Sequence, residues 1–500
     1  MASLRKILIA NRGEIALRIL RGCRELGISP VAVYSDADRR GLHVLHADEA
    51  YRLGPAPSVE SYLRGDLILE IALACGADAI HPGYGFLSEN ADFADACASA
   101  GIVFIGPPAS AMRELGSKTR ARAAADRAGT PRVPGSVSGL VSAEEGLQLA
   151  TEIGYPVMLK AAAGGGGKGM RAIRRADELP EAFRAASEEA LRAFGSAEVY
   201  LEKLIERPRH IEIQLLADQY GNVVSLGERE CSVQRRHQKV IEEAPSAVVD
   251  PSLRQRMGEA ACRLARQAGY VNAGTVEFLM DDAQNFYFLE MNTRLQVEHA
   301  VTELVTGLDL VHLQIAIAEG KPLPFTQQQV AWRGHAIEVR VYAEDPDAGF
   351  MPSPGRITRL LRPGGPGLRE DEGVYEGWEV PSDYDAMLSK LVAYAPDRST
   401  AIARLACAID EYVIGGIKTN LKLLRRILGD PDFQAARIDT AYLDRMLASP
   451  ATAAAPEMNG SSSLAAAVAA VHFAAPAAPP AAPTLETAWK HAAAWEGLRR

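Results

Sequence analysis

The amino-acid sequence predicts a multidomain protein that combines α/β and α+β folds. The chain has 500 residues, more than one ordinary domain holds, and 48% of them are hydrophobic, enough for several cores. Short apolar runs alternate with amphipathic segments in residues 1–116, as in a parallel sheet with helical crossovers. Residues 331–447 mix apolar runs with turns rich in Gly and Pro, which favours a compact α+β domain.

The first 116 residues predict a Rossmann-like α/β domain. Apolar runs at residues 6–10, 31–34, 79–81 and 102–105 are expected to form strands, and residues 14–26 are expected to form the first helix. Strands that alternate with helices in this way pair in parallel.

The middle of the chain, residues 117–330, begins with a predicted helix at residues 117–128. A smaller unit at about 133–204 follows and contains a glycine run between Lys160 and Lys168. The run includes GxGxxG, but it lies far from the first strand–helix turn, and Met170 stands where a Walker motif needs Ser or Thr. Glycine backbone N–H groups can approach phosphate closely, and two lysines add positive charge. We therefore expect a mobile lid over a nucleotide phosphate; the alternative is a hairpin loop that binds nothing.

Residues 286–298 carry the most informative pattern. As a strand, the segment would place mainly apolar side chains at odd positions, from Tyr287 to Val297, on one face. The other face carries oxygen ligands and charge, and from its start these residues are Glu290, Asn292, Arg294, Gln296 and Glu298. An edge strand facing water is the alternative, but the absence of lysine argues against it.

A magnesium site is expected at the start of this polar face. Glu290 and Asn292 are successive on one face, close enough to bracket one metal ion, or two bridged by phosphate. Glu277 lies on the preceding predicted strand, residues 274–280. A hairpin through residues 281–285 would bring Glu277 beside Glu290. Arg294 and Glu298 would then lie beyond the metal, where a small anion can be held and deprotonated.

A basic run at residues 228–245 predicts a second contribution to anion binding. Five cationic or titratable side chains fall within eleven residues: Arg229, Arg235, Arg236, His237 and Lys239. A solvated surface is the ordinary explanation for most of such a run. Here the run joins β-like segments in a chain of net charge −9, so an anion site fits it.

Composition excludes several classes of protein. A net charge of −9 gives no electrostatic footprint for nucleic acid or an anionic membrane, and no apolar stretch of about 20 residues predicts a membrane span. The six cysteines form no CxxC pair, which indicates a reduced, cytoplasmic protein; Cys231 is notable because it lies in a polar motif. Residues 448–500 are dominated by Ala, Pro and Ser and are expected to be a flexible tail, with docking of a partner through Trp489 and Trp495 less favoured.

Several motifs together resemble biotin carboxylases over about residues 6–447. The motifs are Asn-Arg-Gly-Glu-Ile-Ala at 11–16, His-Pro-Gly-Tyr-Gly-Phe-Leu-Ser-Glu at 81–89, the glycine run at 164–170, Ser-Val-Gln-Arg-Arg-His-Gln-Lys at 232–239, Glu-Met-Asn-Thr-Arg at 290–294, Gln-Val-Glu-His at 296–299 and Ala-Glu-Asp-Pro at 343–346. The resemblance implies a three-part fold: an N-terminal α/β domain (1–116), an ATP-grasp domain (117–330) with a lid at about 133–204, and a C-terminal biotin carboxylase domain (331–447).

The resemblance also implies roles for individual residues. Those implied to bind ATP are Lys118, Lys160, Gly166, Gly167, Glu202, Lys203, Ile205, His210, Gln234 and His237. Those implied to hold Mg²⁺ or Mn²⁺ are Glu277, Glu290 and Asn292. Those implied to act on the other substrates are Lys239, Arg294, Gln296 and Val297 for bicarbonate, Glu298 as general base, Arg340 beside the biotin enolate, and Tyr84 near biotin.

The implied activity is the ATP- and bicarbonate-dependent carboxylation of biotin through carboxyphosphate, the first half-reaction of an acetyl-CoA or other acyl-CoA carboxylase, as in fatty acid biosynthesis. No Ala-Met-Lys-Met motif is present, so biotin is expected on a separate biotin carboxyl carrier protein. The resemblance also implies a carboxyltransferase subunit as partner and a homodimer, while the acyl acceptor stays open. Ala300 and Ala163 depart from the family pattern, with small expected effects.

Two alternatives remain at this stage. One is another ATP-grasp ligase that activates a carboxylate, such as an enzyme of the carbamoyl-phosphate type; the basic run and Arg340 argue against it. The other is a non-catalytic ATP-binding protein with a regulatory role. That hypothesis predicts the loss of a base or metal ligand, yet Glu298, Glu277 and Glu290 are all present.

Overall fold

The structure, a computed structural model, describes residues 3–136, 138–161 and 170–448. The chain divides into two units, Met1–Met446 and Leu447–Arg500. Of the second unit only the end of helix α15 (Tyr442–Ala448) is described. The predicted tail at 448–500 therefore lies, apart from its first residue, outside the described residues.

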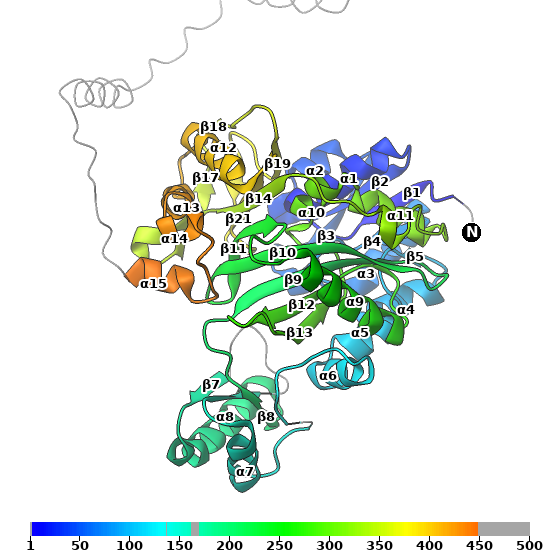
Figure 1. The fold of residues 1–500 in the computed structure, drawn as a ribbon. Helices are drawn as coiled ribbons and strands as arrows, with labels where there is room; N and C mark the ends of the chain where they lie inside the picture. The colour runs from blue at the N-terminus through cyan, green and yellow to red at the C-terminus, as the bar shows by residue number, and fades with distance from the viewer. Residues whose placement is uncertain (1–2, 137, 162–169, 449–500) are drawn as a thin grey trace, which may run out of the picture. The chain divides into compact units, whose positions relative to one another are not determined.

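The N-terminal segment forms the expected parallel sheet, with strands in the order β3-β2-β1-β4-β5 (Figure 1). Its strands are β1 (Lys6–Ile9), β2 (Ser29–Ser35), β3 (Glu49–Gly54), β4 (Ala79–His81) and β5 (Val103–Phe104). Helix α1 (Gly13–Glu25) follows β1, as predicted. The sequence did not predict β3, because this edge strand is mostly polar or exposed and lacks an apolar run.

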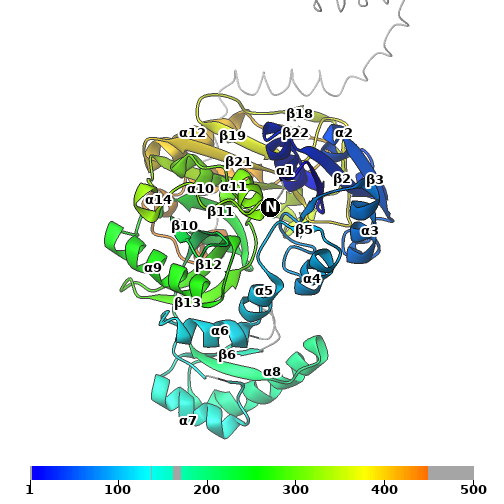
Figure 2. The ribbon, with the colours of Figure 1, turned by 90° about the vertical axis from the view of Figure 1, so that its right-hand side faces the viewer.

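A small antiparallel sheet, β7-β6-β8, forms the unit around the glycine run. It consists of β6 (Val157–Ala161), β7 (Met170–Ile173) and β8 (Val199–Lys203), and helices α7 (Ala143–Ile153) and α8 (Leu179–Phe194) pack against it (Figure 2). The run connects the paired strands β6 and β7. Residues 162–169, including Gly166 and Gly167, lie outside the described residues, so the mobility of this lid stays a prediction.

An antiparallel sheet of eight strands forms the centre of the molecule, in the order β13-β12-β9-β10-β11-β14-β21-β19 (Figure 1). The strands are β9 (Arg209–Ala217), β10 (Val223–Arg235), β11 (Gln238–Ala244), β12 (Asn272–Met280), β13 (Phe286–Asn292), β14 (His335–Tyr342), β19 (Leu368–Glu372) and β21 (Met387–Ala395). Strand β11 pairs with β14, so one sheet continues across the predicted boundary at residue 330.

Helices cover this sheet. Helix α9 (Pro251–Gln267) packs on β9 and β10, α10 (His299–Thr306) packs on β10, β11, β14 and β21, and α12 (Arg398–Glu411) packs on β14 and β21. The remaining helices are α2 (Leu42–His46), α3 (Gly65–Cys75), α4 (Ala91–Ser99), α5 (Ala109–Leu115), α6 (Lys118–Arg127), α11 (Leu310–Ala318), α13 (Leu421–Leu428) and α14 (Pro431–Gln434). The short strands are β15 (Glu344–Asp345), β16 (Met351–Pro352), β17 (Gly355–Arg356), β18 (Arg359–Leu361), β20 (Glu379–Val380) and β22 (Val413–Gly415).

A helix that crosses a bilayer must be both long and apolar. Within the described ranges, no single helix is both long and apolar enough to cross one; only α10 and α11 taken together reach that composition, and they are bent by 95°.

A buried ion network joins three parts of the chain. Arg18 of α1 donates to the carboxylate of Glu303 on α10 at 3.0 Å and to that of Asp309 at 2.7 Å. Arg369 of β19 donates to the other oxygen of Glu303 at 2.6 Å. The Glu303 side chain is only 5% exposed. The Glu303 carboxylate therefore connects the N-terminal, central and C-terminal segments through its contacts with Arg18 and Arg369.

This network predicts a pH dependence of stability. Burial opposes ionisation of Glu303, but His299, Arg18 and Arg369 outweigh it and lower the pKa of Glu303 to about 2. Because the folded-state pKa is depressed below 4.5, the stabilisation is complete above pH 4.5 and is lost as pH falls toward 2. We expect Glu303→Gln to be less stable at pH 7 and to lose stability less steeply below about pH 4.5. Urea unfolding at stepwise lower pH measures this, and equal pH slopes in both proteins would contradict it.

Candidate active site

One cavity of about 770 Å³ lies between the small sheet of the lid and the central sheet. It collects most of the residues singled out in the sequence. The predicted site residues that line it are Lys160, Glu202, Lys203, Ile205, His210, Gln234, His237, Lys239, Glu277, Glu290, Asn292, Arg294, Gln296, Val297, Glu298 and Arg340. Lys118 begins α6, but its side chain is not among those described.

The predicted hairpin is confirmed. Strands β12 and β13 pair antiparallel, and Glu277 lies directly opposite Glu290. The prediction of one strand from 286 to 298 is wrong beyond Asn292, where β13 ends. The chain turns away there because Glu89 accepts hydrogen bonds from the backbone N–H of Thr293, at 2.9 Å, and from Nε of Arg294, at 3.1 Å.

The predicted division into two faces also needs correction. A bulge between Glu277 and Phe278 shifts the pairing, so Glu290 is opposite Glu277 while Phe288 is opposite Phe278. Phe288 therefore enters the core although it lies at an even position, and Leu289, predicted to pack, lines the cavity. A β-bulge reverses the alternation of side chains in this way.

The three predicted metal ligands lie on one wall of the cavity. Glu277 accepts hydrogen bonds at 2.8 Å from the side-chain amides of both Asn292 and Gln296, and its second oxygen lies 2.9 Å from Nε2 of His210. Burial opposes ionisation of Glu277, but Lys239 and His210 outweigh it and hold its pKa well below the usual range. Two carboxylates and an amide oxygen form the hard oxygen donor set that Mg²⁺ prefers beside phosphate. The residues present thus fit a divalent cation.

Lys239 links this wall to the predicted base. Its Nζ lies 2.5 Å from Glu212, 3.0 Å from Glu277 and 2.6 Å from Glu298. Burial disfavours the charged lysine, but the three carboxylates outweigh it and raise its pKa well above the usual value. The ammonium group is therefore retained at neutral pH.

Glu298 lies between two cations. Its Oε1 accepts from Lys239, and its Oε2 accepts from Nη2 of Arg340 at 2.8 Å. Burial raises the energy of its charged form, but Lys239, Arg340 and Arg229 outweigh that effect and hold the pKa of Glu298 well below its usual range. The carboxylate is therefore ionised at neutral pH.

Arg229 does not act as the basic run suggested. It is fully buried and donates to Gln214 at 2.7 Å and to Gln296 at 2.6 Å, besides an ion pair with Glu212. It does not line the cavity; instead it supports the residues that do. A signal for this was present in β9, where Glu212 and Gln214 alternate with isoleucine and leucine, so a buried cation was needed to pair with them.

Lys203, implied by the resemblance to bind ATP, and Cys231, whose role was left open, were also singled out in the sequence. Lys203 lines the cavity, but its Nζ donates to the backbone carbonyls of Gly154 and Tyr155, each at 3.0 Å. Cys231 is fully buried, and burial raises the pKa of its thiol well above the usual value. Cys231 therefore stays a protonated thiol inside the sheet.

A second cavity, of about 480 Å³, adjoins the first. Tyr84 and Glu14 line it from the N-terminal segment. Four residues line both cavities: Arg294, Val297, Arg340 and Asp385. The predicted biotin contacts Tyr84 and Arg340 thus border one space, which opens next to Glu298.

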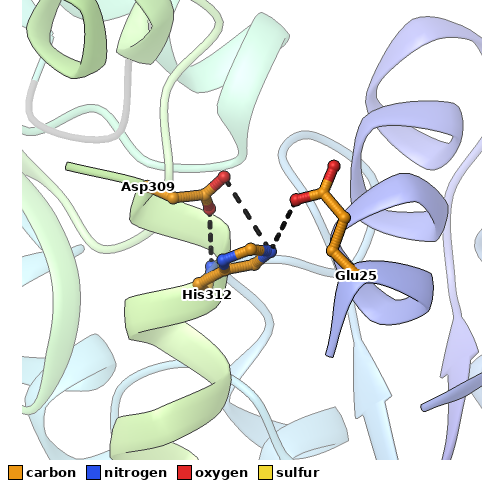
Figure 3. A group of neighbouring side chains, drawn as sticks. All are labelled: Glu25, Asp309 and His312. Carbon is orange, nitrogen blue, oxygen red and sulfur yellow. Dashed lines mark hydrogen bonds and ion pairs between the residues drawn. The ribbon is translucent and has the colours of Figure 1, made fainter. Parts of the chain in front are cut away.

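A separate cluster of ligand-type side chains lies outside both cavities: Glu25, Asp309 and His312 (Figure 3). Nε2 of His312 lies 3.2 Å from Glu25, while the His312 backbone N–H donates to Asp309 at 2.7 Å, which caps α11. Asp309 also accepts from Arg18, and the Glu25 side chain is 63% exposed. We interpret this cluster as a helix cap and a polar contact between segments.

Three family models match the chain in order. They are described as Biotin carboxylase, N-terminal domain (residues 3–112), Carbamoyl-phosphate synthase L chain, ATP binding domain (117–326) and Biotin carboxylase C-terminal domain (338–445). A biotin carboxylase of Nostoc sp. is 55% identical over 88% of this chain and 99% of that protein. A pyruvate carboxylase component of Methanothermobacter thermautotrophicus is 52% identical over 88% of this chain and 89% of that protein.

Solved structures agree with these matches. The biotin carboxylase β,γ-ATP complex from Campylobacter jejuni is similar with a TM-score of 0.85 and 48% identity, over 89% of this chain and 99% of that one. The biotin carboxylase domain dimer of the Hydrogenobacter thermophilus 2-oxoglutarate carboxylase, in complex with MgADP and bicarbonate, has a TM-score of 0.85 and 46% identity, over 90% of this chain and 100% of that one.

Proposed function

The chain belongs to the biotin carboxylase family, and we propose that Glu298, Lys239, Arg294 and Arg340 carry out its reaction. The protein is an ATP-grasp ligase that carboxylates biotin with ATP and bicarbonate, the first half-reaction of biotin-dependent carboxylases. One observation carries the assignment of roles: the Glu298 carboxylate lies between Lys239 and Arg340, in the same cavity as Glu277, Glu290 and Asn292.

Bicarbonate activation is the first step. Arg294 and Lys239 bind the anion, and Glu298 removes its proton, so that a bicarbonate oxygen attacks the γ-phosphorus of ATP as the bond to ADP breaks. A general base works best when its pKa is near the operating pH. Because Lys239 is shared by three carboxylates, an arriving anion competes for it, weakens its contact with Glu298 and raises the pKa of that carboxylate toward this range.

Charge neutralisation is the second requirement of this step. Glu277, Glu290 and Asn292 would hold the divalent cation, which supplies positive charge to the transferring phosphoryl group. Lys239 faces the same region and stabilises the negative charge that develops on carboxyphosphate.

Carboxyl transfer follows in the adjoining cavity. Carboxyphosphate breaks into CO₂ and phosphate, and phosphate takes the N1 proton of biotin. The biotin enolate then forms the C–N bond with CO₂. Arg340 lines both cavities, so its guanidinium faces the enolate oxygen without leaving Glu298. Tyr84 lines the second cavity as well and would contact biotin there. Lid closure over the phosphates excludes water from the labile intermediate.

The partners proposed here follow from the family. A biotin carboxyl carrier protein presents biotin, a carboxyltransferase subunit uses the carboxylated product, and two copies of this chain form a homodimer, as in the Hydrogenobacter thermophilus domain. The similar proteins include components of a pyruvate carboxylase and of a methylcrotonoyl-CoA carboxylase, so family membership leaves the final acceptor open. All six cysteines are free, which fits the proposed cytoplasmic location.

The two alternatives fit the chain less well. The ATP-binding model carries the name of carbamoyl-phosphate synthase, but the models on both sides of it are those of biotin carboxylase. A non-catalytic role does not explain why the base and the metal ligands meet in one cavity.

An ATP hydrolysis assay with bicarbonate and biotin added or omitted tests the proposed function. We expect ATP hydrolysis that depends on bicarbonate and increases when free biotin is added, because CO₂ is then consumed by carboxylation of biotin. Release of ADP with and without each substrate measures it. A sample that hydrolyses ATP with bicarbonate but shows no stimulation by biotin would contradict the proposal.

A further inference from the structure

Lys390 is a fully buried lysine next to the active site. It lies on β21, directly opposite Arg340 on β14 and opposite Asp371 on β19. Its Nζ donates to the backbone carbonyl of Val297 at 2.7 Å. It also lies 3.5 Å from Oε2 of Glu14 and 3.4 Å from Oδ2 of Asp371. One ammonium group thus contacts α1, β19 and the segment that carries the base.

Fold stability alone does not explain a lysine at this position. Burying an ammonium group costs several kcal/mol before its contacts are counted, and an apolar residue often fills such a site at no loss of stability. Burial disfavours the charged lysine, but the carboxylates of Glu14, Asp371 and Glu338 outweigh it and raise the pKa of Lys390. The two ion pairs are long, and the shortest contact is to the neutral carbonyl of Val297.

The hydrogen bond from Lys390 to the Val297 carbonyl constrains a segment that borders both cavities. The carbonyl belongs to the peptide that joins Val297 to Glu298, and Val297 borders both cavities. This segment lies beyond the end of β13 and before α10, so no strand ladder fixes it. The Glu298 carboxylate is held by Lys239 and Arg340, while Lys390 holds the backbone just before it.

Lys390 also reaches the wall of the second cavity. Glu14 is buried beside it, and the other oxygen of Glu14 accepts the hydroxyl of Tyr84. The ammonium group therefore contacts the segment of the proposed base and a carboxylate that positions the proposed biotin contact.

We propose that Lys390 is a positioning residue of the carboxylation reaction, which fixes the Val297–Glu298 peptide so that bicarbonate and the Glu298 carboxylate keep their reactive geometry. This inference rests on the roles proposed above for Val297 and Glu298. It assigns Lys390 no contact with substrate, and its effect is exerted through the backbone.

The test uses two variants and the bicarbonate-dependent hydrolysis of ATP without biotin. Lys390→Met removes the hydrogen bond to Val297. The double variant Lys390→Met/Glu14→Gln removes the same bond but also the carboxylate that would otherwise be left without its cation, so it protects against a failure to fold. A misplacement of about 1 Å costs about 100-fold in rate. We expect kcat/KM for bicarbonate to fall about 100-fold in both variants, while KM for ATP is unchanged.

Arg398→Gln is the matched control. It breaks the ion pair between α12 and Glu243, 2.6 Å long and largely buried, in the same C-terminal segment but outside both cavities. We expect it to lower the melting temperature and to leave KM for bicarbonate unchanged per folded molecule.

Three outcomes would overturn the proposal. The first is that the folded Lys390 variants keep the wild-type KM and kcat for bicarbonate. The second is that KM rises in parallel for ATP and bicarbonate, and the third is that both variants fail to fold. Each outcome would mean that Lys390 is a structural cation only. Glu298→Gln is measured alongside. If that variant stays active, the proposed base is wrong whatever the Lys390 variants do, so the two failures are distinguishable.

Discussion

Replacing Glu298 by glutamine is expected to lower the turnover of biotin carboxylation by about 1,000-fold while ATP still binds. Glutamine keeps the shape of the side chain and can accept a hydrogen bond from Lys239 or Arg340, but it cannot take the proton of bicarbonate. The loss should therefore appear in kcat. Turnover by ADP release and the Kd of ATP by titration calorimetry measure the two effects separately.

A control for this variant is Glu303→Gln, which changes an equally buried carboxylate that also lies between two cations, here Arg18 and Arg369. It should keep normal turnover per folded molecule. Near-normal turnover of Glu298→Gln would remove Glu298 from the role of base, and a loss of ATP binding would show that the substitution disturbs more than proton transfer.

Replacing Lys239 by glutamine is expected to lower kcat/KM for bicarbonate by about 100- to 1,000-fold. The substitution removes a cation that faces the developing carboxyphosphate and leaves Glu212, Glu277 and Glu298 without their common partner. Steady-state kinetics with varied bicarbonate measure the effect. Because three buried carboxylates lose their cation, the folded fraction is measured by circular dichroism in the same samples.

Arg235→Gln is the matched control for Lys239, since it lies in the same basic run. The guanidinium of Arg235 stacks 3.6 Å from the centre of the Phe350 ring and does not line the first cavity. It should leave kcat/KM for bicarbonate unchanged. Equal losses in the two variants would mean that the total charge of the run matters, and Lys239 would lose its specific role.

The alternation of neighbouring side chains predicted one part of the site, the hairpin that carries Glu277 and Glu290. The hairpin that pairs Glu277 with Glu290 followed from two strands and a short turn. The pattern failed after Asn292, because Glu89, far away in the sequence, accepts the N–H of Thr293 and directs the chain out of the sheet. A contact across that separation leaves no trace in the alternation of neighbouring side chains.

Buried charges formed the other gap between sequence and structure. Arg229 looked like part of a solvated or anion-binding run, and Lys390 drew no attention in an ordinary apolar segment. The alternation in β9 indicated that Glu212 needs a buried cation, but only the strand pairing identifies that cation as Arg229. The pairing of β19 with β21 likewise places Asp371 beside Lys390. Strand order within the eight-stranded sheet was not predictable from the periodicity of single strands.

The continuous eight-stranded sheet has a consequence for how the chain can evolve. The family models stop at residue 326 and resume at residue 338, yet β11 and β14, on either side of this gap, are hydrogen-bonded neighbours. A gene split there would leave β11 and β14 as unpaired sheet edges and would place Arg340 and Glu298 on separate chains. We therefore expect residues 209–395, which contain all eight strands, to be inherited as one unit.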